Sequence, residues 1–554
     1  MQNIRILSLK NISSTSKKQI WPTSLFALLT IAAFIAISFS WKNDDILSVN
    51  YNSVIFSAVL CLIFFKLLLL LFSPLLCFSF ILILAAIIRH ASNIKEENTN
   101  EPLIYGDISH INHIGLALKF IPTYALILGL ISLLLISTIL IKQAIKRKKN
   151  KTSLKIIILS LITLTIYSSG EISSLIIKQS KNFGIKYYSW DWKYNALENG
   201  LLIHLLQTSL RPNPVKLTRN QTEEFTNYIK RSAITIDAPK LFINILCEAC
   251  WYDEHLLKNS FQPLIELGGI EMRGISPIFG GGTPNASIEM LTGLPIVNPA
   301  LSGVVYQEYR DFITNETSTL PAHLLNNGIR TFSAHNYTKK FWFREAVEPK
   351  LGFEAFFGIE DMNPEDRSGD WYPRDTILYN FTLQEILKLN NERAFINLAT
   401  VYTHGPFEEL DNDGGITNYQ NKIDTAINDI VDFIKKVKTV EPGAVFLIYG
   451  DHKPYLKATE NYKSLSRHDR GDMPVLIIDP NIERAKKLKV STNKKPFYCY
   501  ATSVSSIYYG MKLPIGKYTD DVCDAYKPDD YEILSRSIPA WVYSAALFNK
   551  TMKH

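Results

Sequence analysis

The chain has 554 residues, of which 47% are hydrophobic and 20% charged, and this composition excludes a disordered or fibrous protein. Residues 1–180 carry 17 Lys and Arg against 7 Asp and Glu, a net of +10, whereas residues 181–554 carry 42 against 45, a net of −3. Because the positive charge interrupts long apolar runs in the first third only, we expect a membrane-embedded N-terminal part and no nucleic-acid partner for the rest.

Four apolar blocks occupy the first third of the chain, at residues 21–41, 54–88, 124–141 and 154–169. A membrane span needs about 20 residues. The second block is longer than one span requires and is broken only by Lys66 and Pro74, so it is either one kinked helix or two short ones.

Basic residues decide between these two interpretations. The N-terminus and the segment 142–155 are both rich in Lys and Arg, and the positive-inside rule places both in the cytoplasm. An even number of spans must separate them, so the second block is expected to cross twice and turn near residues 66–74. The prediction is an anchor of five transmembrane helices, with everything after residue 178 outside the cytoplasm.

Other interpretations of the apolar blocks fit less well. A cleaved signal peptide is disfavoured by the length of the first block, the missing cleavage site and the spans that follow. A transporter is disfavoured because the spans show no repeat and few charges.

An aromatic segment at residues 187–194 follows the anchor and is typical of the lipid headgroup layer. The next stretch, 196–210, has apolar residues at helical spacing. It is either a helix lying along the membrane surface or a linker helix packed on the outer domain.

The C-terminal part alternates short apolar runs with helical patterns, which predicts an α/β domain with a mainly parallel sheet. The expected strands are 241–246, 331–333, 395–399, 445–449 and 475–478, and the clearest helices are 317–326 and 418–437.

Carboxylates and histidines follow three of the expected strands. Glu248 follows the first, His404 the third, and Asp451 with His452 the fourth. Each alone is more typical of a helix cap or a surface position. Because parallel strands end at one edge of a sheet, together they predict a divalent metal site there.

A nucleophile candidate lies behind a run of three glycines, Gly280 to Gly282. Thr283 and Pro284 have the chemistry of an N-cap and a first helical position. The segment is either simply a helix start or a phosphate site, since glycines let a phosphate approach the backbone and helix N-termini favour anions. A Thr hydroxyl needs a base or metal to become a nucleophile.

These residues together resemble the lipoteichoic acid synthases and the phosphoglycerol transferases of periplasmic glucans, within the sulfatase/alkaline phosphatase superfamily. The shared features are a Glu after the first strand, a Thr opening a helix behind a Gly-rich loop, and Tyr-Gly-Asp-His. The segments 335–345 and 351–357 are similar to the family's Phe-Trp-x-Arg segment and the Gly-Phe-x-x-Phe-Phe that follows it, and Asn199-Gly200-Leu201 is similar to the stretch before the catalytic domain.

The resemblance implies a role for each matching residue. Thr283 would be the covalent nucleophile and would bind one divalent metal ion with Glu248, Asp451 and His452. The metal would be Mn²⁺ in the first place, with Zn²⁺ or Mg²⁺ as alternatives. The expected substrate-binding residues are His404, Trp342, Arg344 and His468, the last also readable as a surface His, and His335 is a weaker candidate.

The implied reaction moves a phosphoglycerol headgroup from phosphatidylglycerol, through a phospho-threonine, to a glycan or glycolipid outside the cytoplasm. The enzyme would be a multi-pass protein of a bacterial inner membrane, with its catalytic domain on the periplasmic side. The nearest alternative is a phosphoethanolamine transferase acting on lipid A or a surface glycan. A sulfatase proper is disfavoured, because no Arg follows Thr283 at the required spacing. A catalytically inactive binding module is a further alternative.

The expected domain limits are 1–178 for the anchor, 179–237 for a linker, 238–512 for the catalytic domain and 513–554 for a tail packed on it. Of the six cysteines, Cys499 and Cys523 could form a disulfide in an oxidising compartment, and Cys247 and Cys250 are either buried thiols or a bridge.

Overall fold

The computed structural model describes residues 13–39, 49–69, 72–99, 101–109, 180–188, 192–209, 214–226, 237–253, 255–362, 372–405, 407, 410 and 412–548. It contains two compact units, one made by residues 1–97 and 101–211 and the other by residues 98–100 and 212–554. The predicted limits at 178, 237 and 512 stay predictions.

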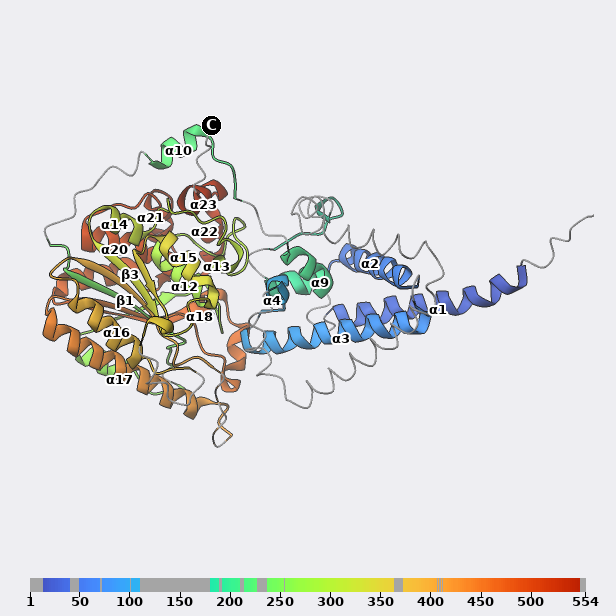
Figure 1. Cartoon of the computed structure of the whole chain (residues 1–554), viewed down its shortest axis with the longest axis horizontal. Coiled ribbons are helices and arrows are strands. Elements are labelled where there is room, and N and C mark those ends of the chain that lie inside the picture. Colours follow the sequence, from blue (N-terminus) through green and yellow to red (C-terminus); the bar gives the residue numbers. More distant parts are fainter. Residues whose placement is uncertain are drawn as a thin grey trace, which may run out of the picture. The chain divides into compact units, whose positions relative to one another are not determined.

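The N-terminal unit is helical in its described part (Figure 1). Buried apolar side chains, among them Phe34, Phe65 and Ile81, join three of its helices into one core. The helices are α1 (Ser13–Ser38), α2 (Tyr51–Leu69), α3 (Pro74–Thr99), α4 (Tyr105–Ser109) and α9 (Trp192–Thr208).

Two described helices are long and apolar enough to cross a membrane, Tyr51–Leu69 and Pro74–Glu96, and Thr23–Ser38 is a shorter apolar helix. The structure therefore supports a membrane anchor with two candidate spans among the described residues, not the five that we predicted. The long second block does form two helices that are separated near Pro74, as the charge argument requires. The predicted spans at 124–141 and 154–169 lie outside the described residues.

Helix α9 packs against α2 within the N-terminal unit, and it is not a part of the outer domain; its position along the membrane surface stays a prediction. Its inner face is polar: the side chains of Asn195, Asn199, His204 and Gln207 are buried and hydrogen-bond to one another. An apolar pattern alone predicts the helix, but it does not predict this buried polar face.

The C-terminal unit is built on an eight-stranded sheet with the order β4-β3-β5-β1-β6-β7-β2-β8. Only β7 runs against its neighbours, so the sheet is mainly parallel as predicted. The strands are β1 (Leu241–Cys247), β2 (Ile270–Ile275), β3 (Arg330–His335), β4 (Ala355–Phe357), β5 (Ala394–Ala399), β6 (Val445–Gly450), β7 (Asp472–Ile478) and β8 (Lys495–Pro496).

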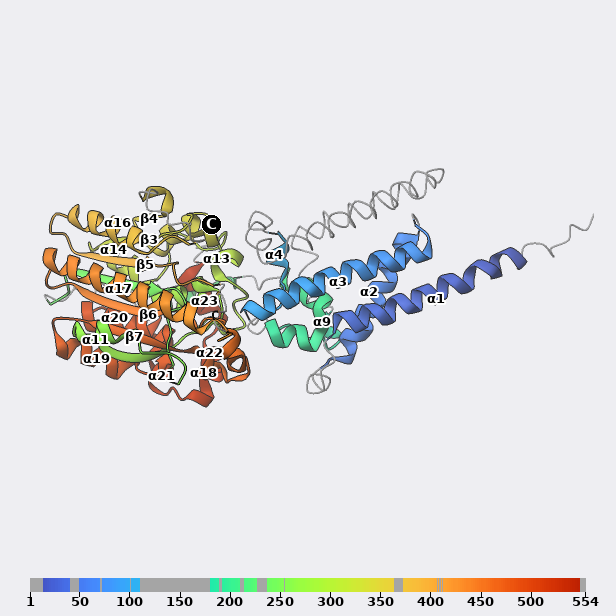
Figure 2. The ribbon, with the colours of Figure 1, turned by 90° about the horizontal axis from the view of Figure 1, so that it is seen from below.

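Helices cover both faces of this sheet, with α16 and α17 on one face and α12, α14 and α20 on the other (Figures 1 and 2). The central strands β1, β5 and β6 are buried along their whole length because both faces are covered. The larger helices are α12 (Thr283–Thr292), α14 (Leu320–Asn326), α16 (Thr376–Leu387), α17 (Ile416–Val440), α19 (Ile482–Thr492), α20 (Tyr500–Tyr509), α21 (Gly516–Asp524), α22 (Tyr531–Ser537) and α23 (Ala540–Leu547).

The last helices belong to the same hydrophobic core, to which α23 contributes Val542, Tyr543 and Leu547. Short helices complete the unit: α10 (Arg219–Thr226), α11 (Gln262–Glu266), α13 (Val305–Glu308), α15 (Arg344–Val347) and α18 (Arg467–Gly471).

Two disulfides link Cys499 to Cys523 and Cys247 to Cys250. The first pairing is the one that the sequence indicated, and the second resolves the choice between thiols and a bridge in favour of the bridge. Cys61 and Cys77 are buried in the candidate membrane helices α2 and α3.

Candidate active site

The candidate site lies where β1 and β6 end. These strands are parallel neighbours, and Cys247 at the end of β1 is in register with Gly450 at the end of β6. The residues that follow them, Glu248 and Asp451, therefore leave the sheet side by side. This is the convergence that the strand pattern predicted.

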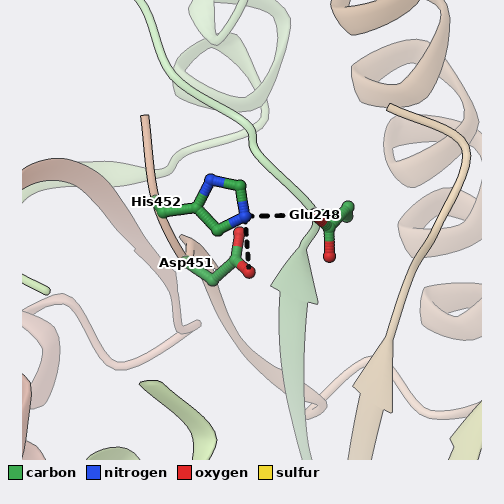
Figure 3. Close-up of side chains that lie close together, drawn as sticks. All are labelled: Glu248, Asp451 and His452. Atoms are coloured by element: carbon green, nitrogen blue, oxygen red, sulfur yellow. Dashed lines mark ion pairs between the residues drawn. The ribbon is translucent and has the colours of Figure 1, made fainter. Parts of the chain in front are cut away.

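Glu248, Asp451 and His452 form a compact buried group (Figure 3). One ligand atom from each lies within 4.8 Å of the others. His452 Nε2 is 3.2 Å from Glu248 Oε1 and 3.6 Å from Asp451 Oδ2. The imidazole nitrogen thus faces both carboxylates, as Figure 3 shows.

Thr283 completes the group from the N-terminus of α12. Its hydroxyl donates a hydrogen bond of 3.0 Å to Glu248 Oε2. The helix begins one residue earlier than we predicted: Gly282, with φ 88°, is the N-cap, and Thr283 is the first helical residue. Because Gly282 adopts a left-handed conformation and has no side chain, the entrance to the helix N-terminus stays open for an anion.

Backbone and hydroxyl contacts hold the two carboxylates in place. Ala249 N donates to Asp451 Oδ1 at 2.7 Å, and Glu248 N donates to Thr400 Oγ1 at 2.9 Å. The hydroxyls of Ser276 and Thr403 donate to the carbonyls of Asp451 and Glu248. The Cys247–Cys250 bridge encloses Glu248 and Ala249, whose φ of 49° is unusual for a residue other than glycine. No motif in the sequence singled out these supporting residues, although Thr400 and Thr403 follow directly on an expected strand.

The charges of the group are strongly coupled. Burial alone would lower the pKa of His452, but the Asp451 and Glu248 carboxylates outweigh it and raise this pKa to about 9. Burial and the Glu248 charge raise the pKa of Asp451, while His452 holds the pKa of Glu248 below its usual value despite burial. In this structure the group therefore uses a proton on His452 to balance the two carboxylates.

A divalent cation fits the same arrangement. His452 Nδ1 hydrogen-bonds to the carbonyl of Lys453 at 2.9 Å, so in neutral His452 the lone pair is on Nε2 and points at the carboxylates. Asp451 Oδ2 and His452 Nε2 are buried without a hydrogen-bond partner in the described part of the chain. Two carboxylates, an imidazole nitrogen and a hydroxyl facing one point form a donor set for such an ion.

His404 lies at the edge of the group, half-buried, and its charge acts on Glu248. Its ring is 4.6 Å from that of Tyr372. Tyr372 in turn contacts Tyr337 at 5.6 Å, and Tyr337 contacts Phe341 at 5.1 Å. This aromatic wall leads from His404 to the Phe341–Arg344 segment. Nothing in the sequence pattern singled out Tyr337 or Tyr372.

Trp342 and Arg344 lie in different environments. Trp342 is half-buried, and both it and Phe343 adopt left-handed backbone conformations, with φ values of 55° and 56°. Arg344 is only 1% exposed and forms a 2.8 Å ion pair with Glu348, which also accepts from the Tyr306 hydroxyl. Arg344 thus already has an anionic partner, which the sequence analysis did not foresee.

His335 and His468 make no hydrogen bond or ion pair with Glu248, Asp451, His452 or Thr283 among the described residues, although the Glu248 charge acts on His335. His335 is buried, its Nδ1 bonds to the carbonyl of Ala399 at 2.8 Å, and burial lowers its pKa to about 3. His468 Nδ1 lies 2.6 Å from the Tyr526 hydroxyl, and burial lowers its pKa. The roles proposed for both residues stay predictions.

Residues 275–502 match the family model described as Sulfatase, and this part of the chain is a sulfatase-family domain. This match falls in the segment for which the sequence predicted a sulfatase-like domain.

Two proteins of Rhizobium meliloti are similar over shorter stretches. The "Capsular polysaccharide biosynthesis protein RkpI" is 30% identical over 146 residues, 25% of this chain and 26% of that protein. The "Putative cyclic beta-1,2-glucan modification protein" is 24% identical over 238 residues, 39% of this chain and 36% of that protein. The chain thus matches only about a quarter to a third of the length of these relatives.

Among solved structures, the lipoteichoic acid synthase LtaP of Listeria monocytogenes superposes with a TM-score of 0.42 and 21% identity. The superposition covers 53% of this chain and 79% of that one.

Proposed function

We propose that this protein is a membrane-anchored, metal-dependent phosphotransferase that moves phosphoglycerol from phosphatidylglycerol to a glycan or glycolipid outside the cytoplasm. The observation that carries the proposal is the buried Thr283 hydroxyl, 3.0 Å from Glu248 at a helix N-terminus and beside Asp451 and His452. The sulfatase-family match and the candidate membrane helices support it.

In the first step Thr283 Oγ attacks the phosphorus of the donor lipid. The bond between Oγ and phosphorus forms, and the bond between phosphorus and the diacylglycerol oxygen breaks. The proton that Thr283 loses is balanced by the one that the diacylglycerol oxygen gains. Glu248, which accepts the hydrogen bond of Thr283, orients the hydroxyl for this attack.

In the second step a hydroxyl of the acceptor attacks the phospho-threonine. The acceptor oxygen bonds to phosphorus, the bond to Oγ breaks, and Thr283 regains a proton. The N–H groups at the start of α12 face the phosphate in both steps and stabilise its charge without having to reorganise.

Glu248, Asp451, His452 and Thr283 would hold the divalent cation, with Mn²⁺ proposed and Zn²⁺ or Mg²⁺ as alternatives. When bound, such an ion would offset the negative charge of the donor phosphate and of Thr283. We assign His404 and Trp342 to contacts with the headgroup. Arg344 is 1% exposed, and one of its N–H groups already donates to Glu348, so the proposal assigns its remaining donors to the headgroup phosphate.

The test incubates the purified full chain with phosphatidylglycerol carrying a labelled glycerol headgroup, in the presence of Mn²⁺ or Zn²⁺, and measures diacylglycerol release. A parallel arm uses phosphatidylethanolamine. The proposal expects release from phosphatidylglycerol and none by Thr283→Ala. Preferential release of diacylglycerol from phosphatidylethanolamine would identify that lipid as the donor instead. No release from either lipid would refute the proposal of a transferase.

A further inference from the structure

The N-terminal unit contains a cavity of about 550 Å³ that belongs to none of the machinery described above. Residues from three segments line it: 49–52 at the start of α2, Lys186 and Tyr188, and Tyr194 and Glu198 on α9. All of them belong to the N-terminal unit.

Hydrogen bonds fix the walls of the cavity to one another. Asn50 donates from its backbone N–H to the carbonyl of Glu198 at 2.8 Å and from its side chain to the carbonyl of Gly184 at 2.9 Å. Ser53 Oγ donates to Asn199 Oδ1, and Asn199 Nδ2 donates to the carbonyl of Lys186, both at 2.7 Å. The cavity is therefore preformed, so a ligand would not have to order it.

The cavity presents groups of both charges. Glu198 is 9% exposed, and its Oε1 lies 3.5 Å from Asn50 Nδ2, while its Oε2 is buried with no hydrogen-bond partner among the described residues. Tyr188 also hydrogen-bonds to this carboxylate, so the group is partly satisfied within the fold, and its Oε2 can accept one further donor from a ligand. Lys186, on another wall, is exposed and supplies a positive charge.

An apolar stripe begins at the rim of the cavity. Tyr51 lines the cavity and starts α2, and every fourth residue after it is exposed: Ile55, Val59, Ile63 and Leu67, whose exposed fractions lie between 62% and 41%. Residues spaced by four lie on one face of a helix. A polar cavity at the end of an apolar helix face matches the two parts of one phospholipid. The headgroup would lie in the cavity, and an acyl chain would lie along the helix.

We infer that this cavity binds the headgroup of a single glycerophospholipid, with the lipid phosphate on Lys186 and a hydroxyl or ammonium donor of the headgroup on Glu198. Tyr188 and Tyr194, whose rings meet edge to face at 4.9 Å, flank the headgroup as aromatic residues do at membrane interfaces. The inference does not rest on the proposed function, because every residue that lines the cavity belongs to the N-terminal unit and binding needs no chemistry at Thr283.

Native mass spectrometry of the full chain carrying Thr283→Ala tests the inference without turnover. The probes are dioleoyl-phosphatidylglycerol, dioleoyl-phosphatidylethanolamine and dioleoyl-phosphatidylcholine, whose choline group has no donor for Glu198. We expect one retained molecule of either of the first two lipids and about tenfold weaker retention of phosphatidylcholine, because a charge-assisted hydrogen bond is lost.

The variants Lys186→Ala and Glu198→Gln should each weaken retention about tenfold, whereas Lys181→Ala, an exposed lysine outside the cavity, should not. Lys186→Glu, at an exposed position, provides a further variant if Glu198→Gln proves unstable. The inference would be overturned by any of three results. These are equal retention of all three lipids, equal effects of Lys186→Ala and Lys181→Ala, or displacement of the lipid by a soluble glucan.

Discussion

At the scale of single residues, the site depends on three acceptor groups aimed at one point. Two carboxylates and the Nε2 of His452 repel one another unless a proton or a cation lies between them. The two carboxylates raise the pKa of His452, which favours a proton on its ring when no cation is bound. A divalent ion would replace that proton and bring one more positive charge.

Asp451→Asn should therefore abolish stabilisation by metal. Asparagine keeps the acceptor for Ala249 N but loses the charge at Oδ2. We expect Mn²⁺ at about 100 times its dissociation constant to stabilise the native chain by about 2.7 kcal/mol and to leave the variant unchanged. Thermal unfolding with Mn²⁺ and with chelator measures this. Asp311→Asn, at an exposed position, is the control. A native chain that is indifferent to every divalent metal would contradict the assigned site.

Glu289, on the buried side of α12, gives a prediction about pH. Burial raises its pKa to about 8 from an ordinary value of 4.5, so the folded state keeps the proton while the unfolded state loses it. Stability should thus fall as the pH rises from about 4.5 to 8. Glu289→Gln keeps an acceptor for Ile296 N and removes this loss.

The melting temperature of Glu289→Gln relative to the native chain should therefore be higher at pH 7.5 than at pH 5. Glu266→Gln, at an exposed position, should show no such change. If the melting temperatures of Glu289→Gln and the native chain differ by the same amount at both pH values, Glu289 does not titrate in this way.

Sequence alone predicted the residues that strand ends bring together, because the ends of neighbouring parallel strands must meet. It did not predict the partner of Arg344. Glu348 lies four residues further along, which is the spacing of an ordinary surface ion pair, but here the pair is buried among Tyr306 and its neighbours. Burial depends on packing between distant segments, which no local pattern contains.

At the scale of elements, the close approach of β6 to the loop after β1 sets the geometry of the site. A Cβ at Gly450 would lie 1.9 Å from the carbonyl oxygen of Cys250. Only glycine therefore lets Asp451 come next to the loop that holds Glu248.

Gly450→Ala should lower the free energy of unfolding by on the order of 1–3 kcal/mol, because the backbone must shift, and should weaken metal binding with it. Gly443→Ala is the matched control, since there the nearest atom is the end of the flexible Glu441 side chain. Chemical denaturation of both variants measures the difference. Equal stability of the two would show that the loop is not tightly packed on β6.

The central strands and long helices were predictable because they are continuous apolar runs or periodic patterns. The strands β2, β4 and β8 were not. The segment Ile270–Ile275 alternates burial and contains Arg273, and β4 and β8 have only three and two residues. Neighbouring strands supply the hydrogen bonds of all three, including β2, which lies between β7 and β8, so their own sequences carry little signal.

At the scale of the whole molecule, the charge asymmetry of the sequence corresponds to two compact units with different chemistry. The described N-terminal helices expose apolar side chains such as Leu28 and Ile55, which is expected of a surface that meets lipid. The C-terminal unit buries its own core around the sheet.

The full chain should therefore stay with membranes after alkaline carbonate extraction, whereas residues 212–554 expressed alone should be soluble and unfold cooperatively. Sedimentation and thermal unfolding of the two forms measure this. Release of the full chain by carbonate would contradict the membrane anchor.

The central claim is that Thr283 becomes covalently phosphorylated by the lipid headgroup. To test this directly, the full chain is mixed with phosphatidylglycerol and Mn²⁺, and the reaction is quenched with acid within one turnover. Mass spectrometry then gives the mass of the peptide that contains Thr283. We expect one added glycerophosphoryl group on Thr283, and none in the Thr283→Ala or Asp451→Asn variants. Diacylglycerol release with an unmodified Thr283 peptide would rule out the phospho-threonine intermediate.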